Sequence, residues 1–283
     1  MLFVLYNPLA NSNQGEKAKD EILPILKEKY GEDITVENVI GINVDNFLGK
    51  LTKEDKVILL GGDGTINRFA NAIYDKKLPC SFYLYKAGTG NDFLRDVEDK
   101  IVDNLLEINE YVKNLPLVIV NDREYRYLNG IGYGIDGMVC ERADKMKDEG
   151  AENINYTTLS IKLLLKGYNP PNAKITVDGE TKEYNKVWLA STMNGRFYGG
   201  GMMPCPNQDR LSNKVSVLCF YGTNRFQTLL IFPKLFKGTH VAHKKHIEIR
   251  SGKEVTVEFD APNALQIDGE TITNVLKYKV IKK

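Results

Sequence analysis

The hydrophobic pattern of the first third of the chain alternates short apolar runs with amphipathic stretches. The apolar runs have the length of strands and cover residues 2–6, 34–40, 56–60 and 81–85. Helical spacing is found over residues 14–30, with Pro24 as a candidate kink, and over 47–51 and 66–74. This alternation predicts a parallel sheet flanked by helices, an α/β layer whose binding sites lie at the carboxyl ends of its strands.

From about residue 116 the pattern changes to many short β-type runs separated by turn residues. These runs are residues 115–121, 124–132, 173–180, 186–194, 214–222, 246–251, 254–260, 264–270 and 276–283. Only 137–147, 153–167 and 225–237 have a helical pattern in this part. We therefore expect an α/β domain over 1–118 and a β-rich, sandwich-like domain over 119–283, with the active site in the interdomain cleft. The extreme C-terminus is expected to pack back on the first domain.

The composition of the chain argues against several classes of protein. The 283 residues include 38 Lys and Arg against 37 Asp and Glu, so no overall charge favours nucleic acid as a partner. No apolar run reaches the length of a membrane span, and the start MLFVLYNP lacks the features of a signal peptide. The four cysteines form no C-x-x-C pair, which argues against zinc and a disulfide framework. A cytoplasmic location is expected.

The turn after residues 56–60 reads Gly61-Gly62-Asp63-Gly64-Thr65. It lacks the Gly-Lys-Ser/Thr of a Walker A loop, but glycines let backbone N–H groups approach phosphates at the start of the next helix. Asp63 could then direct Mg²⁺ toward phosphoryl oxygens. A tight turn with an aspartate cap explains this stretch alone equally well.

A second glycine turn, Gly88-Thr89-Gly90-Asn91-Asp92-Phe93, follows the next predicted strand. It is not a dinucleotide fingerprint, because Phe93 stands where the third glycine would be. Asn91 or Asp92 alone could be a simple helix cap. Because consecutive strands often pair, however, we expect Asp63 and Asp92 to face one cleft.

Taken in order, these motifs resemble the diacylglycerol kinase catalytic-domain family, which includes bacterial lipid kinases and the sphingosine and ceramide kinases. The resemblance covers nearly the whole chain. It rests on Asn7-Pro8, GGDGT with Asn67, GTGNDF with Arg95, NGIGYGIDGMV (129–139), NGRFYGGGM (194–202) and IDGE (267–270). GGDGT also occurs in NAD kinases and, more loosely, in phosphofructokinases. The NDF and NGRFYGGGM stretches favour the lipid-kinase branch.

The resemblance implies ATP- and Mg²⁺-dependent phosphoryl transfer to a lipid hydroxyl, with diacylglycerol as the first candidate acceptor. It implies that the first domain binds nucleotide and the second binds lipid. Asp63 and Asp92 would organise Mg²⁺ and nucleotide, and Asp268 with Glu270 beside it would supply the general base. The implied nucleotide-binding residues are Asn7, Gly61, Gly62, Asp63, Gly64, Thr65, Asn67, Thr89 and Asn91.

Other interpretations stay open at this stage. Asp268-Gly269-Glu270 could be a plain turn between strands, as the same tripeptide at 178–180 is expected to be. NAD kinase-like phosphorylation of a polar acceptor is one alternative function, and a non-catalytic nucleotide- or lipid-binding module is another. The acceptor lipid is not identified, with sphingoid bases and polyprenol-type alcohols also open.

The chain departs from the family pattern in two respects. Arg68 stands where an acid commonly follows the motif asparagine. Bacterial members also hold a structural Mg²⁺ with acids after the glycine-rich hairpin, where Leu211 and Ser216 stand here. Hard divalent cations bind oxygen ligands, so we expect this structural Mg²⁺ to be absent, with Lys214 as a nearby charge. A shifted register would bring in Asp209 instead.

The segment 226–236 is apolar and is followed by a basic stretch with all three histidines. An amphipathic element with a basic rim would suit an anionic membrane surface, and would place the protein at the inner membrane surface. A buried helix followed by a solvated loop explains the pattern at least as well. The expected partner is the lipid substrate. The oligomeric state is open, a homodimer included.

Overall fold

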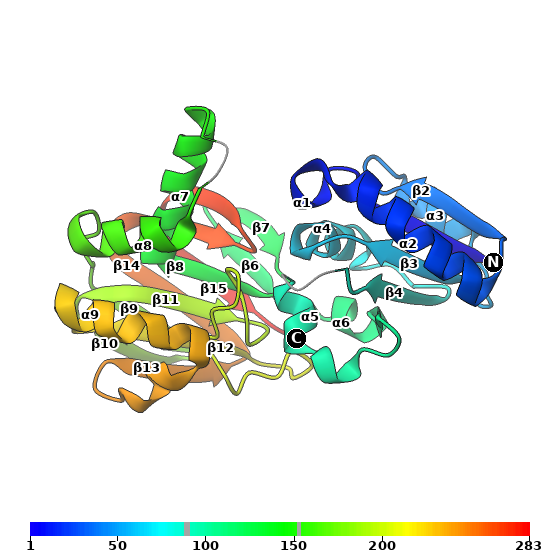
Figure 1. The fold of residues 1–283 in the computed structure, drawn as a ribbon. Helices are drawn as coiled ribbons and strands as arrows, with labels where there is room; N and C mark the ends of the chain where they lie inside the picture. Colours follow the sequence, from blue (N-terminus) through cyan, green and yellow to red (C-terminus); the bar gives the residue numbers. More distant parts are fainter. Residues whose placement is uncertain (88–90, 152–153) are drawn as a thin grey trace. The chain divides into compact units, whose positions relative to one another are not determined.

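The computed structural model describes residues 1–87, 91–151 and 154–283, which form two compact units, residues 1–115 and 116–283 (Figure 1). Among the described residues, no helix combines the length and the apolar character that crossing a membrane would require.

The first unit contains one sheet with strand order β2-β1-β3-β4-β5. Its strands are β1 (Leu2–Tyr6), β2 (Ile34–Asn38), β3 (Lys56–Leu60), β4 (Ser81–Tyr85) and β5 (Leu105–Glu107). The neighbouring pairs among β1 to β4 are parallel, and the predicted α/β layer is confirmed. The short β5 pairs antiparallel with β4 at the sheet edge, and three residues are too few to give a pattern in the sequence.

Helices flank this sheet and supply its remaining core. They are α1 (Ala10–Asn13), α2 (Gly15–Tyr30), α3 (Val44–Lys50), α4 (Asp63–Ile73), α5 (Asp92–Asp96), the 3₁₀ turn η1 (Glu98–Lys100) and α6 (Asn109–Lys113). Helix α2 continues through Pro24 without ending. Helix α4 buries Ile66, Phe69, Ala70 and Ile73, the spacing of a single helix face. Because this buried face anchors α4 on the sheet, it also holds the glycine turn at the start of the helix in position.

The second unit is built on antiparallel pairing. Its strands are β6 (Leu117–Val120), β7 (Arg123–Arg126), β8 (Gly130–Gly134), β9 (Ala173–Val177), β10 (Glu180–Tyr184), β11 (Val187–Met193), β12 (Val215–Tyr221), β13 (Ile247–Gly252), β14 (Glu254–Ile267) and β15 (Glu270–Ile281). The main path runs β13-β12-β11-β8-β14-β15-β6-β7, while β9 pairs with β10 and β14. The predicted β-rich domain is confirmed.

One strand corrects the sequence interpretation. Residues 254–260 and 264–270 were expected to be separate strands, but 254–267 form the single strand β14. The pairing register with β15 shifts between Glu258 and Asn263, where Pro262 lies. A proline without an N–H is tolerated at such an irregularity, so the strand continues past Pro262.

The helices of the second unit are α7 (Ile135–Asp148), α8 (Tyr156–Lys166), α9 (Arg225–Ile231) and the 3₁₀ segments η2 (Phe232–Lys237) and η3 (Thr239–Ala242). The predicted helix 225–237 divides into α9 and η2, with Pro233 in the first turn of η2. Helix α7 lies directly on β14, because a Cβ at Gly137 would be 1.9 Å from the carbonyl oxygen of Ala264. Residues at the start of α7 are thereby held beside the β14–β15 hairpin.

Candidate active-site residues

In the first unit, the segments that follow β1 and β3 are joined by side chains. Asn7, directly after β1, donates from Nδ2 to the Thr65 hydroxyl at 2.9 Å, and its Oδ1 accepts from the Leu9 N–H at 3.0 Å. β1 and β3 are neighbours in the sheet, so this contact joins adjacent carboxyl ends. The structure therefore brings together two of the predicted nucleotide-binding residues.

The glycines of the 61–65 turn differ in how much space a Cβ atom would have at each position. A Cβ at Gly61 would lie 2.5 Å from the Thr65 side chain, so only glycine fits there. At Gly62 and Gly64, by contrast, a Cβ would meet no other group of the described residues within 4 Å. Gly62 caps helix α4 without a side chain. With respect to the described residues, the backbone at this helix start is thus open to a ligand, and helix N-termini favour anions such as phosphate.

Asp63 links this turn to the one after β4. Its Oδ2 accepts from the Asp92 N–H at 2.8 Å and its Oδ1 from the Phe93 N–H at 3.0 Å. Asp63 therefore satisfies the first N–H groups of α5, the helix that follows the neighbouring strand β4. The two glycine–aspartate turns meet, as their position on consecutive strands suggested.

The neighbouring residues of the second turn are also placed by α5. The Asn91 Oδ1 accepts from the Leu94 N–H at 2.9 Å, while its Nδ2 is buried and has no hydrogen-bond partner among the described residues. Asp92 is buried, with the Arg95 guanidinium 3.8 Å from its Oδ1. The predicted residue Thr89 lies outside the described residues. A buried donor such as the Asn91 amide suits a phosphate or ribose oxygen.

Two further residues of the nucleotide motif lie on helix α4. The Asn67 Oδ1 accepts from Asn71 Nδ2 at 2.8 Å, one helical turn further on. Arg68, the departure from the family pattern, is exposed on the same helix. Its charge therefore lies at the surface of the first unit.

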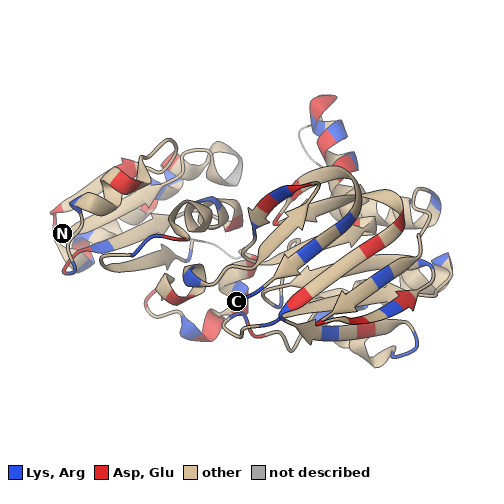
Figure 2. Ribbon diagram, turned by 180° about the vertical axis from the view of Figure 1, so that it is seen from behind, with Lys and Arg blue, Asp and Glu red and all other residues tan. Residues whose placement is uncertain are grey.

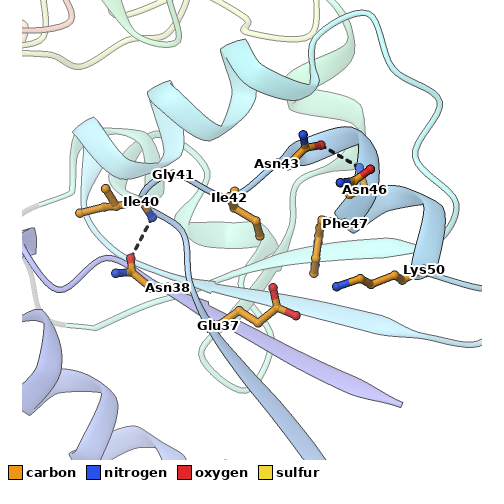
Figure 3. Close-up of a pocket in the computed structure, with 9 residues that line it drawn as sticks. All are labelled: Glu37, Asn38, Ile40, Gly41, Ile42, Asn43, Asn46, Phe47 and Lys50. Carbon is orange, nitrogen blue, oxygen red and sulfur yellow. Dashed lines mark hydrogen bonds between the residues drawn. The ribbon is translucent and has the colours of Figure 1, made fainter.

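A cavity of about 450 Å³ opens beside the carboxyl end of β2 (Figure 3). It was not predicted from the sequence, since its walls come from a strand end, a loop and a helix. The lining residues are Glu37, Asn38, Ile40, Gly41, Ile42, Asn43, Asn46, Phe47 and Lys50. Because β2 pairs with β1, this cavity lies at the same sheet edge as Asn7 and the glycine turn.

In the second unit, Asp268 occupies the tight turn between β14 and β15, with a φ of 46°. Its carboxylate accepts hydrogen bonds from the N–H groups of Leu128, Asn129 and Gly130, the last two at 2.9 Å. Asp268 is therefore a turn residue and also the anchor of the chain entering β8. Glu270, the other acid predicted here, is exposed at the start of β15.

The tripeptide Asp178-Gly179-Glu180 has a geometry similar to that of Asp268-Gly269-Glu270, although it does not lie at the position of the family motif. Asp178 has a φ of 49°, and its Oδ1 accepts from the N–H groups of Lys253 and Glu254, both at 2.9 Å. Hydrogen bonds to backbone N–H groups thus accompany the turn in both copies. A catalytic role for Asp268 stays a prediction, because such geometry alone does not distinguish it from a structural aspartate.

A third acid, Asp136, was not singled out from the sequence. It lies near the start of α7, where its Oδ2 accepts from Gln266 Nε2 at 2.9 Å. The Gln266 Oε1 in turn accepts from the Gly269 N–H at 2.7 Å, so Asp136 is tied to the Asp268 turn. Burial raises the pKa of Asp136 to about 6, although hydrogen bonds from Gln266 and Tyr198 oppose this shift.

The glycines of the stretch 129–139 were one sequence feature that could have pointed to Asp136, because one of them leaves room for its carboxylate. A Cβ at Gly132 would lie 1.7 Å from the Asp136 Oδ2, so the carboxylate fits only because residue 132 is glycine. The partner Gln266 could not be found in this way, since it lies far away in the sequence. A carboxyl with a pKa near neutrality is suited to accept a proton.

The stretch expected to lack a structural metal is occupied by protein hydrogen bonds. Ser216, where an acid was expected, donates to Gln208 Oε1 at 2.5 Å and also contacts Ser251. The Gln208 Nε2 donates to the carbonyl oxygens of Asn194, Asp209 and Lys214. This amide already occupies three carbonyl oxygens in and beside the stretch, and Leu211 and Ser216 offer no carboxylate, so the residues present do not suit the structural Mg²⁺. Its absence stays a prediction.

Two buried cations lie next to this stretch. The Lys282 ammonium donates to Asn194 Oδ1 at 2.6 Å and to the Arg210 carbonyl at 2.8 Å. Arg210 donates to the Leu128 carbonyl at 2.6 Å and to Asn129 Oδ1 at 2.9 Å. Both cations are at least 95% buried. Arg210 therefore supports the same chain segment whose N–H groups bind the Asp268 carboxylate, and Lys282 in turn contacts Arg210.

A catalytic Mg²⁺ would need other ligands than the structural Mg²⁺ discussed above. Within the described residues, no group of three or more His, Cys, Asp or Glu side chains could hold a metal ion. Mg²⁺ at a phosphoryl-transfer site, however, commonly uses one or two carboxylates and completes its shell with water and phosphate oxygens. Asp63, whose carboxylate accepts from the Asp92 backbone N–H, and Asp92 itself would supply the two carboxylates of that smaller requirement.

In a comparison with known proteins, one family model matches the first part of the chain and another matches the second part. The family model described as the diacylglycerol kinase catalytic domain matches residues 1–118. The model described as the YegS C-terminal NAD kinase beta sandwich-like domain matches residues 129–279. A diacylglycerol kinase of Mycobacterium tuberculosis is 26% identical over 270 residues, covering 91% of this chain and 84% of that protein.

Solved structures show the same fold. A crystal structure of a diacylglycerol kinase from Bacillus anthracis str. Sterne aligns with a TM-score of 0.60 at 18% identity, covering 99% of this chain and 93% of that one. Another crystal structure from that organism aligns with a TM-score of 0.67 at 19% identity, covering 100% and 91%. The chain therefore belongs to the diacylglycerol kinase family of enzymes, with the YegS-type domain as its second part.

Proposed function

We propose that the protein transfers the γ-phosphoryl group of ATP to a lipid hydroxyl, with diacylglycerol or a related lipid as the acceptor. The observation that supports this best is the junction of the two glycine–aspartate turns. There Asp63 bridges to α5 beside an open helix start, which is an arrangement for binding phosphate. The membership in a family of lipid kinases supplies the acceptor class.

The first unit also contains a cavity that could hold another part of the nucleotide. Its cavity at the end of β2 is separated from the glycine turn after β3 by the single strand β1. Two strand spacings are about 10 Å, comparable with the distance between the base and the outer phosphates of a nucleotide. We place the adenine in the cavity and the phosphates at the glycine turn, with the Asn91 amide as a donor.

Mg²⁺, when bound by Asp63 and Asp92, would neutralise charge on the transferred phosphoryl group. The protein itself positions the phosphates through the backbone of α4 and the Asn7–Thr65 contact. The residues of the second unit act on the acceptor. There Asp268 is the predicted proton acceptor, and Asp136 is a second candidate because its pKa of about 6 suits that task.

A transfer assay with labelled ATP tests the proposal against lipid extracts, purified diacylglycerol, a sphingoid base, a polyprenol and NAD, each with and without Mg²⁺. We expect labelled product from a lipid, dependent on Mg²⁺. An Asp63→Asn variant should lose this activity, while an Asp20→Asn variant on the exposed face of α2 should keep it.

Three outcomes would contradict the proposal in different ways. Labelling of NAD alone would favour a polar acceptor. ATP binding without transfer to any acceptor would favour a non-catalytic binding module. Equal transfer with and without Mg²⁺ would remove the metal from the mechanism while leaving the lipid acceptor in place.

A further inference from the structure

Two cations of the second unit are buried, whereas acidic and basic residues alternate along its outer strands and pair there (Figure 2). Arg210 is 5% exposed and Lys282 is 2% exposed. The two groups that accept hydrogen bonds from Lys282 are neutral oxygens, and burial together with repulsion by Arg210 lowers the pKa of Lys282 to about 8. Taking a cation out of water costs free energy that neutral partners offset only in part. Two neighbouring buried cations are therefore a costly feature of this fold.

Both cations act on one backbone carbonyl, that of Leu128. The Arg210 Nη1 donates to this oxygen at 2.6 Å, and the Asn194 Nδ2 donates to it at 2.9 Å. At the other end of the Asn194 side chain, Oδ1 accepts from the Lys282 ammonium at 2.6 Å. The Leu128 oxygen therefore has two donors, a guanidinium and an amide that is itself polarised by an ammonium.

The peptide group that contains this carbonyl also binds the carboxylate of Asp268. Its N–H, that of Asn129, donates to the Asp268 Oδ1 at 2.9 Å. A hydrogen bond to the oxygen of a peptide group polarises the group and strengthens its N–H as a donor. Arg210 also donates to the Asn129 side-chain Oδ1 at 2.9 Å, which holds this residue from a second direction. A single peptide group thus separates the Arg210 guanidinium from the Asp268 carboxylate.

The next peptide group has a similar arrangement. The Asn129 carbonyl accepts from the N–H groups of Asn194 and Gly195, at 2.9 and 3.1 Å. The N–H of the same peptide, that of Gly130, donates to the Asp268 Oδ1 at 2.9 Å. Asn129 and Asn194 are both at least 95% buried, and hydrogen bonds shielded from water are the stronger ones. The donors that hold Asp268 are therefore themselves held in place by buried groups.

The turn at Asp178 shows that an aspartate in such a turn does not require this network. Asp178 also accepts from two backbone N–H groups, and it also has an arginine nearby. That arginine, Arg250, donates to the carbonyls of Ile175 and Glu180, at 3.1 and 2.8 Å. Those carbonyls belong to other peptide groups than the two that bind Asp178. Of the two turns, only the one at Asp268 has a cation hydrogen-bonded to the peptide that binds its carboxylate.

We propose that Arg210 and Lys282 are positioning residues for the phosphoryl transfer. They hold the Asp268 carboxylate by way of the Leu128–Asn129 peptide, which Lys282 reaches through Asn194. A proton acceptor must be aimed closely at the reacting hydroxyl, and a small misplacement slows the chemical step while the substrates still bind. The proposal deepens the proposed function and rests on it, because Asp268 has a proton to accept only if a hydroxyl is phosphorylated.

Steady-state kinetics of the full-length protein test this role. Arg210→Met should lower kcat about 10- to 100-fold and leave KM for ATP and for diacylglycerol within about twofold. Lys282→Met should lower kcat by about three- to tenfold, a smaller loss because Lys282 acts through Asn194. Arg210→Lys keeps a cationic donor for the Leu128 carbonyl but loses the bond to Asn129. Its kcat should lie between those of the wild type and Arg210→Met.

Arg250→Met is the matched control. It removes an arginine whose side chain is 12% exposed, and whose hydrogen bonds also go to backbone carbonyls, from the surroundings of the other turn. It should lower the temperature of thermal unfolding and leave kcat unchanged. All rates are compared well below the lowest unfolding temperature of the set.

A second measurement needs no turnover. In the ¹H–¹⁵N spectrum of the deuterated full-length protein, without nucleotide or lipid, the amide proton of Asn129 reports the strength of its hydrogen bond to Asp268. Arg210→Met should move this signal upfield, because the N–H becomes a weaker donor. Lys282→Met should move it in the same direction by less, and Arg250→Met should leave it in place. If Arg210→Met does not fold, Lys282→Met supplies both measurements.

Several results would overturn the proposal. They are an unchanged kcat in folded Arg210→Met and Lys282→Met, an equal loss of kcat in Arg250→Met, or a rise in KM without a fall in kcat. An Asn129 signal that stays in place in both variants would show that the peptide group does not couple the cations to Asp268. If the wild type transfers no phosphate while the signal moves as expected, the proposed function alone is wrong, and the coupling of the cations to Asp268 stands.

Discussion

At the scale of single residues, Asp178 and Asp268 form a natural comparison. We expect Asp178→Asn and Asp268→Asn each to lower the free energy of unfolding by about 1–3 kcal/mol, because each carboxylate binds backbone N–H groups. Only Asp268→Asn should abolish turnover, with ATP binding retained. Chemical denaturation, steady-state kinetics and calorimetric titration of ATP measure the three quantities.

The comparison separates a catalytic role from a structural one. If both variants lose activity in proportion to stability, Asp268 acts by holding the entry to β8. Wild-type rates in Asp268→Asn would remove this residue from the mechanism and leave Asp136 as the remaining proton acceptor.

Asp136 gives a prediction with a defined pH range. Its pKa in the folded protein is about 6, above the value of 3.8 for an ordinary aspartate, so its contribution to stability is lost as the pH rises from about 4 to 6. Asp136→Asn should therefore raise the free energy of unfolding at pH 7 by about 1–3 kcal/mol and change it little at pH 3.5. Urea denaturation at the two pH values measures this.

The activity of the same variant tests a second point. If Asp136 accepts the proton of the acceptor hydroxyl, wild-type activity should fall below about pH 6, and Asp136→Asn should be inactive although more stable. A variant with wild-type activity and an unchanged pH profile would show that the carboxyl only packs against Gln266.

Local motifs made some site residues visible in the sequence and left others hidden. Asp63 and Asn91 stand in glycine turns, where strand ends and helix starts can be read from a few neighbours. The link from Asp136 through Gln266 to the β14–β15 turn joins residues 130 positions apart. No local pattern contains that contact, because it exists only after α7 packs on β14.

At the scale of elements, the packing of α7 against β14 depends on one glycine. Gly137→Ala should lower the free energy of unfolding by about 2 kcal/mol or more, since the added Cβ would meet the Ala264 carbonyl. Gly49→Ala on α3 is a matched control, because no atom lies within 4 Å of its Cβ position. That variant should be unchanged or up to about 1 kcal/mol more stable. Equal effects would show that α7 can shift away from the strand.

The elements of the first unit could be predicted because each strand and helix has its own pattern. Strands β1, β3 and β4 have the predicted bounds. Prediction was weaker in the second unit, where the exposed strand β10 has little apolar character and β14 continues past Pro262. Whether a strand bends or ends at a proline depends on its partners, and those come from distant parts of the chain.

At the scale of the whole molecule, the buried lysine at the end of β15 predicts how stability depends on pH. Burial and the nearby Arg210 lower the pKa of Lys282 to about 8, from 10.5. The unfolded chain binds the proton more tightly, so the free energy of unfolding should rise between about pH 8 and 10. Lys282→Met should lack this rise, and the difference between the two proteins cancels the titration of other groups. A parallel pH dependence in both would refute the assignment.

The same network makes a prediction about metal. Gln208 and Lys282 already donate hydrogen bonds to oxygens of Asn194, Asp209, Arg210 and Lys214, so a chelator should leave the melting temperature of the protein unchanged. Differential scanning calorimetry with excess EDTA, followed by addition of Mg²⁺, measures this without nucleotide. A clear drop with EDTA that Mg²⁺ reverses would mean that a structural ion is present.

The position of β15 also determines the order in which the molecule can be made. β15 lies between β14 and β6, so the first strand of the second unit, which pairs with β7 at once, finds its other neighbour only when the last strand has been synthesised. Strands of the first unit pair mostly with partners close in sequence, and that unit can fold while the ribosome is still working. The β6–β7 hairpin must wait with an open edge until synthesis reaches β15. A ribosome that pauses before residue 270 therefore holds a folded first unit and an unfinished second one, which is the stage most exposed to aggregation.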